Sequence, residues 1–211
     1  MSGIDMYRKQ WPRVGAVLGM AVAGATALTA GRKATPRTLA AVNFAALLVH
    51  QYEEYVDPGW FPGQFNQGMF KSDTPRNYPL NTNSALIVNT VFAYPFYIAP
   101  ILFPKRKWLG LAPAIFGIMQ AGGHGVIFPR VAGDKYSPGF LASFLLHIPI
   151  GVSYIRALNR EEQLSAADVA KGILYTVGFA VVGIAGPNLV AHDKNSPHAF
   201  TKAQMGRHDV D

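Results

Sequence analysis

The chain has 211 residues, of which 50% are hydrophobic and only 15% are charged. An average soluble domain is about 25% charged, and here the charges are also segregated, so a soluble α/β enzyme is excluded. The chain has no cysteine, which excludes disulfide frameworks, thiolate nucleophiles and cysteine-based metal sites. The net charge of +7 does not indicate binding to nucleic acid, because the basic residues gather at the ends of apolar segments, as at membrane interfaces.

Long uncharged runs separate the charged residues. Five of the six runs hold roughly 18 residues or more, the length of a candidate transmembrane helix, and they lack the amphipathic stripes of soluble helices. The runs are Val14–Gly31, Thr38–Tyr52, Asn77–Pro104, Trp108–Pro129, Tyr136–Ile155 and Gly172–His192. We therefore predict an all-α, polytopic transmembrane helical bundle of about six (five to six) spans in residues 1–192, followed by a polar tail in residues 193–211. The expected location is integral in a membrane, with several passes.

The first two predicted helices differ in character. Val14–Gly31 follows a basic start, so it is either a retained span or a cleaved signal peptide. The second helix should begin with Thr35 as N-cap and Pro36 at the first helical position, and should run to about Tyr55. It is the one apolar helix that acidic residues interrupt near its end.

The segment Val56–Leu80 is rich in proline, glycine and aromatic residues, which favours either an interfacial or re-entrant cap or an ordinary surface loop. Four further spans are expected at about Thr82–Phe103, Trp108–Phe128, Pro138–Ala157 and Val169–Leu189. The tail from His192 to Asp211 is polar, and we expect it to be mobile.

Ionisable residues inside membrane helices are costly, and are by default candidates for function. The two carboxylates in the predicted spans are Glu53 and Glu54, and His50 precedes them on the same helix. At about 100° per residue the three side chains occupy an arc of about 100°. They therefore present one polar face near the end of the second helix.

The topology brings further polar residues to the same side of the membrane. With six spans, the second and fourth helices end, and the third and fifth begin, on one side, which places His124 and His147 in the same leaflet as His50. The other polar residues expected there are Asn83, Asn89, Gln120, Tyr136, Asn188 and His192. We therefore expect one shared intramembrane pocket.

Imidazoles and carboxylates without thiolates suit Zn²⁺, Fe²⁺ or Mn²⁺. We predict a divalent metal site with His50, Glu53, Glu54 and His124 as ligands and His147 as a further candidate. His50, Glu53 and Glu54 are also the predicted catalytic residues. We expect Asn83, Asn89, Gln120 and Tyr136 to contact the substrate or to support the ligands.

The simplest reaction for such a site is hydrolysis by a metal-bound water, with one glutamate as general base. Oxidation by iron is an alternative. The expected substrate is lipid-like or otherwise hydrophobic, and membrane lipid is the expected partner.

Three other readings of the same residues stay open. The first is a metal-free lipid isomerase or cyclase, in which a glutamate acts with His50 as acid and base. The second is a proton- or cation-coupled transporter, which the lack of an evident inverted repeat argues against. In the third, Glu53 and Glu54 are merely solvated at the level of the lipid headgroups.

The segment His50-Gln-Tyr-Glu53-Glu54, the later His124 and Tyr136-Ser-Pro-Gly139 together resemble the HXXEE-motif membrane proteins over about Ala40–Ile155. The resemblance implies a helical membrane fold and a functional His/Glu site, but no particular reaction. Some members of that family have a second histidine where Gln120 stands in this chain.

Overall fold

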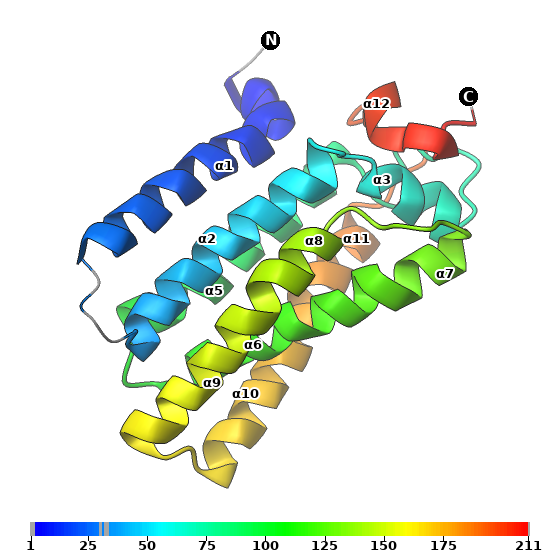
Figure 1. Cartoon of the computed structure of the whole chain (residues 1–211). Helices are drawn as coiled ribbons and strands as arrows, with labels where there is room; N and C mark the ends of the chain where they lie inside the picture. The colour runs from blue at the N-terminus through cyan, green and yellow to red at the C-terminus, as the bar shows by residue number, and fades with distance from the viewer. Residues whose placement is uncertain (1–2, 30, 32–33, 211) are drawn as a thin grey trace.

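A computed structural model describes residues 3–29, 31 and 34–210 of the chain, and the regular elements in these ranges are all helices (Figure 1). The first helix, α1 (Gly3–Thr29), begins earlier than the predicted span, which was expected to reach Gly31; Ala30 lies outside the described residues. The second helix, α2 (Pro36–Tyr55), has the predicted bounds and the predicted Thr35 cap, whose side chain accepts a hydrogen bond from the Thr38 amide.

Four more long helices follow, and each is built of consecutive pieces. The third long helix consists of α4 (Thr82–Leu86), η2 (Ile87–Phe92) and α5 (Ala93–Leu102). The fourth consists of α6 (Lys107–Gly122), η3 (Gly123–Ile127) and α7 (Phe128–Ala132). The fifth consists of α8 (Phe140–Ala142), η4 (Ser143–His147) and α9 (Ile148–Glu162). The sixth consists of α10 (Ala166–Gly178), η5 (Phe179–Ala185) and α11 (Gly186–Val190).

Five of the long helices, all except α2, are long and apolar enough to cross a membrane. The chain is therefore a multi-pass membrane protein, as predicted. Helix α2 contains Arg37, Glu53 and Glu54, yet 14 of its 20 residues are buried. Figure 1 shows why: α2 lies inside the bundle, in contact with α1, α5, α6 and α9. A helix covered by protein on most sides can carry polar groups that would be costly against lipid.

Proline residues shape the four helices that follow α2. The η pieces are π-helical turns, and each ends two or three residues before a proline: Pro95, Pro129, Pro149 or Pro187. A proline inside a helix lacks a donor, and its ring clashes with the carbonyl one turn earlier. The wider π turn accommodates that ring, so the helix continues instead of ending. The turns also set the directions of side chains within them, including Asn89, His124 and His147.

Aromatic packing fills the centre of the bundle. The rings of Phe96 and Phe179 stack with centroids 4.1 Å apart, and they join the third long helix to the sixth. Phe44 and Leu48 of α2 belong to the same core. The stacking of Phe96 on Phe179 holds the sixth long helix against the third.

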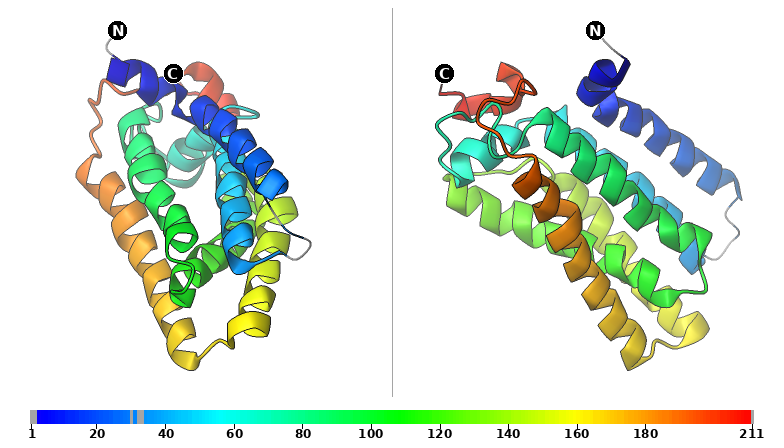
Figure 2. Two further views of the ribbon diagram at one scale, coloured as in Figure 1. Left: turned by 90° about the vertical axis from the view of Figure 1, so that its left-hand side faces the viewer. Right: turned by 180° about the vertical axis from the view of Figure 1, so that it is seen from behind.

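The segment 56–81 and the C-terminal tail fold together over one end of the bundle. The segment contains α3 (Phe61–Gly63) and η1 (Gln64–Met69), and the tail contains α12 (Lys202–Met205) and η6 (Gly206–His208). Figure 2 shows α12 at the same end of the molecule as the start of α1.

The expectation of a mobile tail was wrong. Phe200 is 4% exposed and Met205 is 0% exposed, and both belong to an apolar cluster with Trp11. Asp209 accepts hydrogen bonds from the Arg76 guanidinium at 2.9 and 3.0 Å. The tail is polar in composition, but its few apolar residues have a site to pack into.

Candidate metal centre

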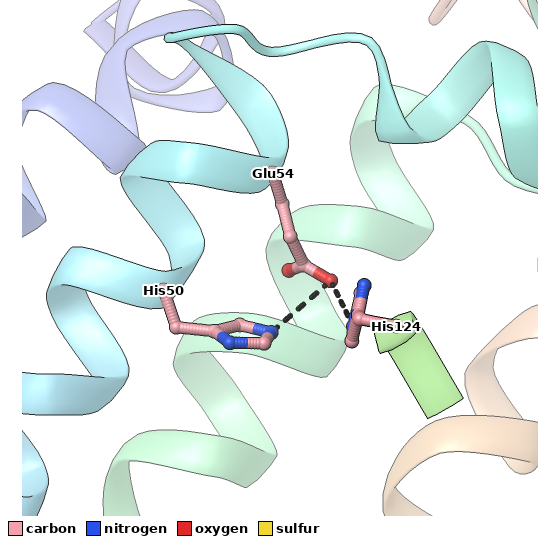
Figure 3. Close-up of side chains that lie close together, drawn as sticks. All are labelled: His50, Glu54 and His124. Atoms are coloured by element: carbon pink, nitrogen blue, oxygen red, sulfur yellow. Dashed lines mark ion pairs between the residues drawn. The ribbon is translucent and has the colours of Figure 1, made fainter. Parts of the chain in front are cut away.

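Three side chains from two separate helices meet in the interior near one end of the bundle. The Nε2 atoms of His50 and His124 each lie 3.3 Å from the same oxygen, Oε1 of Glu54. Figure 3 shows the two rings pointing at this oxygen, His50 from α2 and His124 from η3. One ligand atom from each residue lies within 4.8 Å of the others, and all three residues are buried. The three form a group that could hold a metal ion.

Contacts on the far side of His50 fix the orientation of its ring. Ser143 Oγ donates to the Gly139 carbonyl at 2.7 Å and lies 3.1 Å from His50 Nδ1. A proton on Nδ1, donated to this oxygen, would leave the lone pair of Nε2 free for a metal. Outer contacts of this kind orient ligand histidines in metal sites.

A serine also supports His124. Its Nδ1 lies 3.0 Å from Ser137 Oγ. With Nδ1 of each ring held by a serine, the Nε2 atoms of both histidines point into the group.

Neither Nε2 atom has a hydrogen-bond partner in the described part of the chain, and both are buried. Either a proton or a cation between each nitrogen and the carboxylate oxygen 3.3 Å away would stabilise this arrangement. Two ligands of one tetrahedral zinc, at bonds of about 2.0 to 2.1 Å, are about 3.3 to 3.4 Å apart. The donor set and its spacing therefore fit a divalent metal.

Gly139 lets the two imidazoles approach each other. It has a φ of 102°, which favours glycine, and a Cβ there would lie 2.7 Å from His124 Cε1 and 2.9 Å from His50 Cε1. The turn before α8 therefore packs against both imidazole rings. This is the structural reason for a glycine at the end of Tyr136-Ser-Pro-Gly139.

Glu53 lies outside the group of three, although it is buried and adjacent to Glu54. Its carboxylate accepts hydrogen bonds from the amides of Leu141 (3.1 Å) and Ala142 (2.8 Å) and from the hydroxyl of Tyr136. These amides are the free donors at the start of the fifth long helix, where a carboxylate is stabilising. Burial raises the pKa of the Tyr136 hydroxyl, and the hydrogen bond to Glu53 raises it further, so this proton stays on Tyr136.

The group of three forms part of the wall of a cavity of about 140 Å³. The remaining wall is mainly apolar, with Phe61, Phe65, Phe116 and Phe128 among its residues. The polar residues of the wall besides the group are Tyr55, Asn89, Gln120 and Asn188. A cavity with apolar walls and a few convergent polar groups is typical of sites for small hydrophobic ligands.

Some of the other predicted site residues line the cavity, and others lie outside it. Asn89 and Gln120 line the cavity, as predicted for substrate contacts. His147 lies outside the group of three, although its ring centroid is 5.6 Å from that of His50. Its Nδ1 is 2.9 Å from Asn43 Oδ1, and amide oxygens only accept, so this nitrogen donates.

Two more predicted residues lie away from the cavity wall. Asn83 accepts a hydrogen bond from Arg8 at 3.2 Å, and Tyr136 donates a hydrogen bond to Glu53, which lies outside the group of three.

Several residues of the site were missed in the sequence. Ser137 and Ser143 support the histidines, Asn43 supports His147, and Tyr55 lines the cavity. Two signals were available: Ser143 lies one helical turn after Gly139, and Asn43 lies two turns before His50 on the same face.

A family model described as "Protein of unknown function with HXXEE motif" matches residues 41–154. The match contains α2 from Ala41 onward, the segment 56–81 and the third to fifth long helices up to Tyr154, and so all three residues of the group. No curated protein and no solved structure matches the chain.

Proposed function

Because the chain belongs to the HXXEE-motif family, whose function is unknown, we propose a function from its own geometry. We propose that it is a membrane metalloenzyme that acts on a lipid-like substrate, with His50, Glu54 and His124 as metal ligands. One observation carries the proposal: two buried imidazole nitrogens, without hydrogen-bond partners among the described residues, point at one carboxylate oxygen. Two histidines and one carboxylate are the ligands of catalytic zinc sites and of non-haem iron(II) sites.

Hydrolysis is the reaction that these residues favour. A bound Zn²⁺ would act as a Lewis acid and lower the pKa of a bound water; Fe²⁺, for oxidation, and Mn²⁺ are the alternative ions. The two neutral imidazoles and the single carboxylate leave a divalent ion with a net positive charge that would favour a polarised carbonyl. The apolar cavity walls exclude bulk water, and Asn89 and Gln120 offer hydrogen bonds that would orient a substrate beside the group.

The surroundings of the cavity support a hydrophobic substrate. Ligand pockets usually measure about 300 to 1,000 Å³, so the cavity of about 140 Å³ would enclose only the reacting end of a lipid. A second cavity of about 220 Å³ lies between the third and sixth long helices, and Phe179 lines both cavities. Its other lining residues include Val91 and Val182, which are 58% and 62% exposed and which would face lipid. A substrate chain would enter from the bilayer along this route.

Metal analysis of the detergent-purified protein tests the metal site. We expect about one zinc or iron ion per chain, and loss of that ion in His124→Ala, since catalytic zinc sites generally use three protein ligands. His192→Ala is the matched control, because His192 is a histidine at the same end of the bundle whose side chain lies outside the group. A wild-type protein that binds neither ion when supplied with it would contradict the proposal and favour metal-free acid–base chemistry.

Mass spectrometry of lipids tests the reaction. Membrane lipid extracts would be incubated with the metal-loaded protein and with Glu54→Gln. Hydrolysis predicts that one lipid class declines in the wild-type sample only, with a matching fatty acid or alcohol released. A product that has gained oxygen without bond cleavage would instead identify iron-dependent oxidation.

A further inference from the structure

A third cavity, of about 300 Å³, lies at the same end of the molecule as the metal centre and has a largely different lining. Its lining residues come from the first turns of α1, from residues 55–59 and from the tail around α12, and Figure 2 draws the start of α1 and α12 at the same end of the molecule. Arg8, Lys9 and Arg13 of α1 line it, and no acidic side chain does within the ranges that the structure describes. The cavity is therefore concave and positively charged.

The three basic residues are held in different ways. The side chain of Arg8 is only 12% exposed and is fixed by Asp5 at 2.5 Å and by Asn83 at 3.2 Å. Lys9 and Arg13 are exposed and lie four residues apart, where like charges on a helix repel each other. Neither has an acidic partner among the residues that the structure describes. Asp5 balances one charge, so two positive charges remain at the cavity without a counter-ion from the protein.

The position of the cavity indicates the chemistry of the missing anion. It lies at the end of α1, a helix that is long and apolar enough to cross a membrane, and buried Trp11 is part of its wall. Basic and tryptophan side chains at the end of such a helix are at the level of the lipid headgroups. The most abundant anionic group at this level is the phosphate of a lipid.

We propose that this basic cavity binds the phosphate group of an anionic membrane lipid. The guanidinium of Arg8 is oriented in advance, and Lys9 and Arg13 supply the charge that the phosphate neutralises. Tyr55 lines both this cavity and the one beside the metal centre. The proposal does not depend on the proposed enzymatic activity.

Lipid titration followed by native mass spectrometry tests the proposal on the full chain in a neutral detergent. We expect phosphatidylglycerol to bind more tightly than phosphatidylcholine. The double variant Lys9→Gln/Arg13→Gln should weaken phosphatidylglycerol binding about 10- to 30-fold, since each basic residue near an anionic surface contributes about 1 kcal/mol. Both side chains are exposed, so thermal unfolding of this variant should match that of the wild type.

The control is Lys105→Gln/Lys135→Gln, which removes the same charge from two exposed lysines outside the cavity. It should change the affinity less than about twofold, because charges beyond a Debye length are screened. Equal losses in the two double variants would overturn the proposal, since binding would then follow overall charge. Displacement of the lipid by inorganic phosphate at a comparable concentration would also overturn it, because the cavity would then be a site for free phosphate.

Discussion

Glu53 and Glu54 are neighbours in the chain and are similarly buried, at 8% and 6% exposure, but the regions around them differ. The chain itself supplies hydrogen bonds to the Glu53 carboxylate, two from amides and one from a tyrosine. Around Glu54 the described residues instead place two nitrogen atoms that have no hydrogen-bond partner among them. The chain satisfies the first carboxylate by itself, and the second belongs to the group that could hold a metal ion.

On the proposed function, this difference assigns a structural role to Glu53 and a metal-binding role to Glu54. A buried polar group normally has a hydrogen-bond partner, because an unpartnered one costs about 1 to 3 kcal/mol. Two unpartnered nitrogens that face the same carboxylate oxygen therefore indicate a binding site, which a single unpartnered atom would not. The following predictions test whether the two regions really have these separate roles.

The largest expected effect is on metal binding. Glu54→Gln should lower metal affinity by more than about 100-fold, because even outer contacts of ligands are worth about 10- to 100-fold. Glu53→Gln should keep the metal but unfold more easily, by about 2 to 4 kcal/mol, since hydrogen bonds to a charged group are lost. Metal content and thermal unfolding in detergent measure the two effects. Loss of metal from a folded Glu53→Gln protein would show that the two regions are not separate.

Gly139→Ala should affect both regions at once. The added methyl would contact His50 and His124 at less than 3 Å and would strain a backbone with a φ of 102°. We expect a loss of about 2 to 4 kcal/mol in stability together with weaker metal binding. Gly133→Ala is the matched control, because its φ of 73° is also positive but nothing lies within 4 Å of a Cβ there. Equal losses in the two variants would mean that backbone strain, and not contact with the histidines, is the cause.

Ser143→Ala should weaken metal binding about 10-fold, because His50 loses the acceptor that orients its ring. A chelator competition assay measures the change. Thr176→Val is the control, since Thr176 is also a buried helix hydroxyl bonded to a carbonyl four residues earlier, but away from the metal centre. An unchanged affinity in Ser143→Ala would argue against His50 as a ligand.

The smallest effect should come from Tyr136→Phe. It removes one hydrogen bond to Glu53 and should cost about 1 kcal/mol of stability, with metal binding unchanged. Comparing the thermal unfolding of Tyr136→Phe with that of Glu53→Gln measures how much of the stability around Glu53 comes from the tyrosine hydrogen bond. A metal affinity that falls with this variant would connect Glu53 to the metal centre after all.

Much of the fold was predictable because membrane helices leave a strong signal. Uncharged runs bounded by basic residues predicted the spanning helices, and the Thr35-Pro36 pair predicted where α2 begins. The arc of His50, Glu53 and Glu54 predicted a polar face, and the topology predicted that His124 would meet it. The folded tail was not predictable, because Phe200 and Met205 gain their stability from contacts distant in sequence.

The sequence by itself indicated that the chain is a helical membrane protein and that Glu53, Glu54 and the intramembrane histidines gather at one end, because apolar length and helical periodicity are local properties. Only the tertiary structure decided which acid faces the histidines. Glu53 and Glu54 differ by about 100° around α2, and the helix packing turns one toward the start of α8 and the other toward His124. The ring orientations of His50 and His124 were decided in the same way, because they depend on serine hydroxyls that distant parts of the chain bring into contact.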